Sequence, residues 1–142
     1  MRGEVYCWDG WCCLEIPNGW TINEEDGVIS LTADDGVGAL QLSFARRNKN
    51  EAVSDTEAIV LAKSFADSCK WPEPLPQLMT IGGSTAAHFE YMEETGAERS
   101  YWCVWQAVEK RRAVLITYTS AWTDREREKS EREQIVASFR WT

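Results

Sequence analysis

The sequence predicts an α+β fold: a three-layer α/β/α sandwich with a central, mainly antiparallel sheet of about six to seven strands and two main helices. Three observations lead to this prediction. Strand-like patterns precede and follow one amphipathic helical stretch, and a second helical stretch closes the chain. Strands and helices do not alternate in the way that builds a parallel sheet. The predicted strands over 101–105 and 114–118 carry large apolar side chains on both faces, so we expect both sides of the sheet to be covered.

Short strands joined by tight turns are predicted for the first third of the chain. The Asp-Gly pair at 9–10 is typical of a hairpin turn, and the Pro-Asn-Gly stretch at 17–19 turns the chain ahead of another strand. Apolar and polar residues then alternate over 28–33 and 39–44, on either side of a turn at 34–36. We expect these last two stretches to pair as a hairpin.

Two capping-box patterns, in which a hydroxyl and a carboxylate satisfy free amides, predict where the helices begin. Ser54 and Glu57 form the first pattern, ahead of an apolar stripe with spacings of three and four. The stripe consists of Ala58, Leu61, Ala62, Phe65, Ala66 and Cys69. Thr123 and Glu126 form the second pattern, which opens a charged helix. We expect its first turns to be solvated and its last turns to pack on the sheet.

Between the two helices the sequence predicts an extended crossover and then more strands. The three prolines within 72–76 forbid a continuing helix, because proline lacks the amide hydrogen. Four strand patterns follow, separated by turns at 82–83, 95–97 and 109–112. They predict a four-stranded antiparallel meander.

Length and composition bound the class of protein. The 142 residues fit one domain of ordinary size, and 44% apolar and 27% charged residues are close to the globular average. No stretch is long and apolar enough for a membrane-spanning helix, and the first residues lack the apolar run of a signal peptide. We therefore expect a cytoplasmic protein, provided that no export segment precedes this chain.

Net charge and cysteine content bound the partners and the redox state. A net charge of −8 repels phosphate backbones and anionic lipids, so we expect no nucleic acid and no membrane as partner, and a protein with a basic surface instead. The cysteines are Cys7, Cys12, Cys13, Cys69 and Cys103. Their odd number and unpaired spacing predict reduced thiols in a reducing compartment.

Two short motifs at opposite ends of the chain resemble the Mog1/PsbP/DcrB-like proteins. The turn Pro17-x-Gly19-Trp20 follows the first strands, and the final helix ends in Ile-x-x-Ser-Phe over 135–139. With the middle helix and the apolar meander between them, the resemblance covers most of the chain. It implies that residues 1–142 form one Mog1/PsbP-like domain. It also implies a binding or accessory role of bacterial type rather than an enzyme, and it assigns no particular binding residues.

The chain offers little material for a catalytic or metal centre. His88 is the only histidine, so a triad or a multi-histidine metal site would have to be built around it. Strand alternation places His88 and Glu90 on one face, which predicts a surface pair. The adjacent Cys12 and Cys13 point to opposite faces, which disfavours a zinc site. A Cys12 or Cys13 thiolate paired with His88 is kept as an alternative, but we predict no catalytic residue, no cofactor and no metal.

Aromatic residues are the better guide to a binding surface. Tryptophan is enriched in binding hot spots because it buries a large area at low entropic cost. We expect Trp20, Trp105 and Trp122 to belong to the core or its rim. The predicted partner-binding residues combine the remaining candidates with acidic turns, and they are Trp8, Trp11, Trp102, Asp34 and Asp35.

These observations favour a small non-enzymatic protein-binding module. The expected role is that of an immunity protein that neutralises a secreted toxin, or of an adaptor or chaperone that binds an effector. One alternative is a carrier of a small ligand or a lipid tail, with an apolar groove between the sheet and a helix. Another is a cysteine-dependent enzyme. The sequence does not indicate an oligomeric state.

Overall fold

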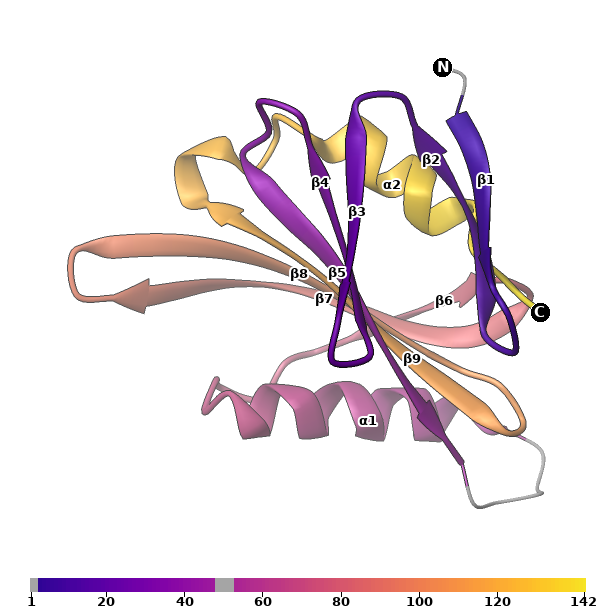
Figure 1. Ribbon diagram of the computed structural model, residues 1–142. Coiled ribbons are helices and arrows are strands. Elements are labelled where there is room, and N and C mark those ends of the chain that lie inside the picture. Colours follow the sequence, from indigo (N-terminus) through magenta and orange to yellow (C-terminus); the bar gives the residue numbers. More distant parts are fainter. Residues whose placement is uncertain (1–2, 48–52) are drawn as a thin grey trace.

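The computed structural model describes residues 3–47 and 53–142, which form two antiparallel sheets and two helices (Figure 1). The helices are α1 (Asp55–Ser68) and α2 (Lys129–Ala137), and a short 3-10 helix, η1 (Trp122–Asp124), precedes α2. The strands are β1 (Gly3–Trp8), β2 (Cys12–Pro17), β3 (Trp20–Glu25), β4 (Val28–Ala33), β5 (Gly38–Arg46), β6 (Gln77–Ile81), β7 (Ser84–Thr95), β8 (Glu98–Val108), β9 (Arg112–Ala121) and β10 (Arg140–Trp141). Within the described residues, no helix has the length and apolar character needed to span a membrane.

The larger sheet has seven strands in the order β3-β4-β5-β9-β8-β7-β6, and all neighbours are antiparallel. Both predicted parts are present: β4 and β5 form the hairpin, and β6 to β9 form the meander. β5 joins the two parts by pairing with β9, where Leu40 lies opposite Tyr118. The predicted α+β sandwich with a mainly antiparallel sheet is confirmed.

One face of this sheet is covered by α1 (Figure 1). The helix presents Ala58, Ala62 and Ala66, all of which are buried, to Phe89 of β7 and Val104 of β8. Alanines leave room for the helix axis to lie close to the sheet, and the larger rings fill the space at the end of α1. The predicted apolar stripe is therefore the packing face of α1.

The opposite face is covered by α2 together with a second sheet of three strands, in the order β1-β2-β10. Leu14 of β2 and Ile135 of α2 belong to one buried cluster with Leu31 and Ile116 of the larger sheet. We expected a helix alone in this layer. The Asp-Gly pair at 9–10 predicted the β1–β2 hairpin of this sheet. Its third strand, β10, has no clear sequence signal, because β10 has only two residues and pairs with a strand from the other end of the chain.

The first capping box marks the start of α1 but works differently from the expected pattern. α1 begins directly after Ser54, and the backbone N–H of Glu57 donates to the Ser54 carbonyl at 3.1 Å, while the Ser54 hydroxyl makes no capping bond. The Glu57 carboxylate instead forms an ion pair with Arg47. Nη1 of Arg47 also donates to the Glu109 carbonyl at 2.8 Å, so the pair ties α1 to the β8–β9 turn.

The second capping box predicted a helix from Thr123, and this prediction was wrong. Only η1 forms there, and α2 begins at Lys129. Glu128 and Arg132 belong to the turns expected to be solvated, but they are 6% and 2% exposed. Both side chains hydrogen-bond buried tyrosines of β9 and β8, which draws this part of the chain onto the sheet.

The expectation of five reduced thiols was also wrong. Cys7 of β1 lies opposite Cys13 of β2, with their Cα atoms 4.0 Å apart, and the two form a disulfide. Cys12, Cys69 and Cys103 are free. The pairing depends on the strand register, which the spacing of the cysteines does not reveal. Cys12 is buried in the core cluster, while the neighbouring Cys13 is bonded to Cys7.

A thiol titration of denatured, unreduced protein is expected to find three free thiols per chain. Cys7→Ser is expected to lower the free energy of unfolding by about 2 kcal/mol, because the disulfide closes a short loop of the unfolded chain. Urea unfolding without reductant measures this change, and Cys69→Ser serves as the control that leaves the bond in place. Five titratable thiols in the unreduced protein would contradict the assignment.

Candidate functional site

A hollow of about 410 Å³ lies between the β1–β2 turn and the β3–β4 turn. We call it the aromatic-acidic groove, because its lining combines rings with carboxylates. The rings and carboxylates are those of Trp8, Trp11, Phe44, Glu24, Glu25 and Asp26. The groove brings together two hairpins that belong to different sheets.

Both turns have the residues that tight hairpins need. Asp26 and Gly27 are the two central residues of the β3–β4 turn and have φ values of 51° and 79°. Asp-Gly suits this left-handed conformation, because glycine has no Cβ and aspartate tolerates it. In the β1–β2 turn, Gly10 has a φ of 79° and the Trp11 N–H donates to the Trp8 carbonyl at 3.0 Å. The turns therefore place their flanking tryptophans and glutamates at the groove.

Direct contacts hold the aromatic side of the groove. The indole N–H of Trp8 donates to the Glu24 carboxylate. The ring of Trp11 lies 5.0 Å from the ring of Phe44, and the Arg46 guanidinium lies 4.8 Å from the centre of the Trp11 ring. The last contact is a cation–π interaction, so the Trp11 ring already carries one cation.

Arg112 supports the β1–β2 turn from β9. Its Nη1 donates to the Gly10 carbonyl at 2.8 Å, and its Nε and Nη2 donate to the two carboxylate oxygens of Glu109 at 2.8 and 3.0 Å. These hydrogen bonds lower the pKa of Glu109 and keep it ionised. A bidentate pair of this kind fixes the direction of the guanidinium, which in turn holds the Gly10 carbonyl of the β1–β2 turn in place.

The structure brings only two of the five predicted partner-binding residues together. Trp8 and Trp11 both line the groove. Asp34 and Asp35 lie in the β4–β5 turn, at the other end of β4, where Asp34 accepts a hydrogen bond from the Thr21 hydroxyl at 3.2 Å. The acidic residues of the groove are Glu24, Glu25 and Asp26 instead. The Asp26-Gly27 pair was an available sequence signal for a hairpin turn, with Glu24 and Glu25 directly before it.

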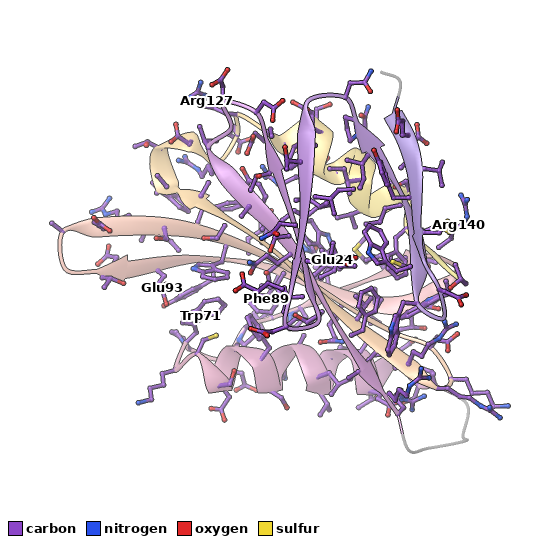
Figure 2. The ribbon with its side chains drawn as sticks, viewed as in Figure 1. Glu24, Trp71, Phe89, Glu93, Arg127 and Arg140 are labelled. Carbon is purple, nitrogen blue, oxygen red and sulfur yellow. A yellow bond between two sulfur atoms is a disulfide. The ribbon has the colours of Figure 1, made fainter. Side chains whose placement is uncertain are left out.

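Trp102 belongs to a different cluster, on the α1 side of the sheet. Its ring lies 5.3 Å from the ring of Trp71, and its indole N–H donates to Glu93 at 3.2 Å. Figure 2 shows Trp71, Phe89 and Glu93 gathered beside one end of α1. Trp102 is thus part of the packing around α1. As expected, Trp105 is buried in the core, and Trp20 and Trp122 pack against it.

No protein-family model matches the sequence, and no curated protein matches it. Solved structures do match. A protein from Bacteroides thetaiotaomicron superposes with a TM-score of 0.75 at 19% identity over 100% of this chain, which spans only 49% of that protein. Cyanobacterial PsbP (CyanoP) from Synechocystis sp. PCC 6803 superposes with a TM-score of 0.66 at 12% identity, over 100% of this chain and 94% of the other. Mog1 superposes with a TM-score of 0.60 at 11% identity, over 97% and 87%.

The chain has a Mog1/PsbP-like fold. The resemblance noted in the two terminal motifs is confirmed at the level of architecture. At these identities the likeness concerns the fold alone, and proteins of one fold differ in the sites that they carry. The function of this Mog1/PsbP-like chain is therefore argued from its own side chains.

In this Mog1/PsbP-like fold, Cys103 is the cysteine whose thiol lies close to His88. Its Sγ lies 4.0 Å from Nδ1 of His88, whereas Cys13 is bonded to Cys7. Burial raises the pKa of the Cys103 thiol to about 12, so it is protonated at neutral pH. Nδ1 of His88 lies 2.9 Å from the Val104 carbonyl oxygen, which can only accept, so Nδ1 carries a hydrogen and cannot take the thiol proton. The Cys103–His88 pair therefore has neither the ionised thiol nor the accepting imidazole nitrogen that a cysteine nucleophile needs.

Proposed function

We propose that this chain is a non-enzymatic protein-binding module that recognises a basic segment of a partner protein through the aromatic-acidic groove. The observation that carries the proposal is the composition of the groove, in which Trp8 and Trp11 lie beside Glu24, Glu25 and Asp26. A lysine or arginine of the partner can lie on an indole face while its charge meets the carboxylates. The net charge of −8 favours the same class of partner, because it speeds the encounter with a basic surface.

Two roles fit this proposal: immunity to a secreted toxin, and binding of an effector as adaptor or chaperone. Toxins that cleave nucleic acids or bind phosphates carry basic active sites, which an acidic groove with aromatic anchors can cover. Buried aromatic anchors slow dissociation and surrounding charges speed association. The groove supports both roles equally, since both need a specific basic protein surface.

The cytoplasmic location expected from the sequence stays a prediction, and the disulfide between Cys7 and Cys13 favours an oxidising compartment instead. Cell fractionation of the native host, with the thiols alkylated before lysis, separates the two possibilities. Recovery from the cytoplasm with both cysteines alkylated would support the original expectation. Recovery with the disulfide intact would support an exported protein.

Glu25→Lys is expected to weaken capture of the partner about tenfold or more, because it places a like charge against a basic surface at the groove. The measurement is affinity capture from the native host, followed by titration of the recovered protein against each variant. Glu98→Lys is the control: it makes the same charge change at an exposed residue that does not line the groove.

Raised salt is expected to weaken the wild-type complex as well, since part of the attraction is between exposed charges. Absence of a stoichiometric protein partner would contradict the proposed function. Equal capture by Glu25→Lys and Glu98→Lys would show that the partner does not bind at the aromatic-acidic groove.

The carrier alternative has one structural feature in its favour. A hollow of about 390 Å³ between the sheet and α2 is lined in part by the apolar side chains of Met79, Ile81, Trp105 and Val136. Native mass spectrometry of freshly purified protein distinguishes the two functions. A retained small molecule of constant mass would favour a carrier, and its absence together with a captured protein would favour the binding module.

A further inference from the structure

On the face of the sheet that α2 covers, three potential metal ligands lie side by side. Glu90 of β7 is paired in register with Cys103 of β8, and His88 lies two residues before Glu90 on β7. Side chains two apart on a strand project from one face, and directly paired residues share that face. An imidazole nitrogen, a carboxylate oxygen and the sulfur of these three residues all lie within 4.8 Å of one another.

The surroundings of His88 fix the direction of its ring. Nδ1 carries its hydrogen toward the Val104 carbonyl oxygen at 2.9 Å, and the ring stacks on Trp105 with centroids 5.2 Å apart. In the neutral imidazole, Nε2 then has a free lone pair, and it lies 3.9 Å from Oε1 of Glu90. Metal-binding histidines in proteins are held in this way, with one ring N–H on a backbone carbonyl and the other nitrogen on the metal.

α2 completes the surroundings of this cluster. Arg132 and Glu133 line the same hollow as His88, Glu90 and Cys103. Glu133 adds a further carboxylate, and Arg132 adds one positive charge. With the thiol ionised, the carboxylates of Glu90 and Glu133 and the Cys103 thiolate carry three negative charges. A divalent cation together with Arg132 would balance them.

We propose that His88, Glu90 and Cys103 bind a zinc ion, with the fourth position taken by Glu133 or by water. One nitrogen, one oxygen and one sulfur donor form a set that zinc accepts in tetrahedral geometry, at about 2.0–2.3 Å from the metal. The donor atoms must move closer together to reach those distances. Glu90 can do so, because its side chain is 59% exposed. As the zinc–sulfur bond forms, the thiol proton leaves to solvent.

This site goes beyond the proposed protein-binding function, because it lies under α2 and shares no residue with the aromatic-acidic groove. Zinc would join β7 to β8 next to the buried face of α2. Since the ion binds the folded chain better than the unfolded chain, saturation is expected to raise Tm by about 5–10 °C. The ion would then stabilise the layer that α2 forms on the sheet.

The test uses the full chain, treated with a chelator and kept free of thiol reductants, which would bind zinc themselves. Calorimetric titration with zinc chloride is expected to show one ion per chain with a Kd of about 1 µM or tighter. Cobalt(II) in place of zinc is expected to give a thiolate-to-metal charge-transfer band. Glu90→Gln should weaken zinc binding at least tenfold, and Cys103→Ala should abolish both zinc binding and the band.

Each variant has a matched control. Glu94→Gln makes the same change at an exposed residue of the same strand, and Cys69→Ala removes a free thiol outside the hollow. Both should bind zinc as the wild type does. Glu90→Gln changes an exposed side chain, so it remains informative even if Cys103→Ala fails to fold. Absence of stoichiometric zinc binding by the wild type, or unchanged binding by Glu90→Gln and Cys103→Ala, would overturn the site. Neither result bears on partner capture by the groove.

Discussion

Trp71→Ala is expected to lower the free energy of unfolding by about 3–5 kcal/mol. This is the cost of removing a buried tryptophan when the neighbouring side chains cannot fill the cavity that it leaves. Trp71 is 8% exposed and lies between the end of α1 and the sheet. Its ring contacts four aromatic rings at centroid distances of 4.7 to 6.3 Å, and its indole N–H donates to Glu93 at 2.8 Å. The four rings are those of Phe65, Phe89, Tyr91 and Trp102.

The backbone explains why Trp71 occupies this place. Lys70 has a φ of 60°, and the N–H groups of Lys70 and Trp71 donate to the carbonyls of Asp67 and Ala66 at 2.9 and 3.0 Å. This is the Schellman pattern that ends a helix and returns the next residue to the packing face. Removing the ring therefore leaves α1 without its anchor on the sheet.

Urea unfolding of Trp71→Ala measures the effect, and Trp71→Phe is the graded control. Phenylalanine keeps an aromatic ring in the cluster and loses the bond to Glu93 and part of the indole volume, so its cost should be clearly smaller. A loss below about 1 kcal/mol for the alanine variant would mean that the cluster does not hold α1.

Glu128→Ala is expected to cost about 2–4 kcal/mol, because it leaves one buried and one partly buried donor without an acceptor. Oε1 of Glu128 accepts from the Tyr118 hydroxyl at 2.7 Å and from the Gly38 N–H at 3.0 Å. Tyr118 is completely buried, and burial together with this hydrogen bond raises the pKa of its hydroxyl. Gly38 has no room for a side chain, because a Cβ there would lie 2.3 Å from the Tyr118 oxygen.

Glu126→Ala is the matched control for this second prediction. Glu126 lies two residues earlier and is exposed, so its removal should change stability by no more than about 0.5 kcal/mol. Thermal or urea unfolding of both variants gives the comparison. Equal stability of the two would show that the hydrogen bonds of Glu128 to Tyr118 and Gly38 do not stabilise the fold.

Periodicity predicted most of the larger sheet. The alternation over 28–33 and 39–44 and the turn signals between the later strands correspond to local hydrogen-bonded hairpins, which depend on neighbouring residues. In the three-stranded sheet, the β1–β2 hairpin has a local turn signal at 9–10, but the pairing of β10 with β2 joins the two ends of the chain, and no local pattern encodes it. The capping box at Thr123 failed for a related reason. Glu128 and Arg132 have the polarity of a solvated helix, and only the buried tyrosines that they contact reveal their place in the core.

The two candidate sites were predictable to different degrees. Trp8 and Trp11 stood out because aromatic residues beside a turn are candidates for binding. Their carboxylate partners come from a turn of another sheet, so the sequence could not pair them. His88 was correctly placed on one face with Glu90, but its proximity to Cys103 follows from the register of β7 on β8. A shift of one residue would have put the thiol on the opposite face.

The pairing of β10 with β2 has a practical consequence for fusion proteins. The N–H of Thr142 donates to the Trp11 carbonyl at 3.2 Å, and Arg112 holds the carbonyls of Gly10 and Thr142 together. A tag appended after residue 142 would therefore emerge beside Trp11, where it could obstruct a docking protein. Gly3 lies opposite Pro17, at the end of the β1–β2 hairpin that is far from Trp11. It is therefore the safer point of attachment for immobilisation.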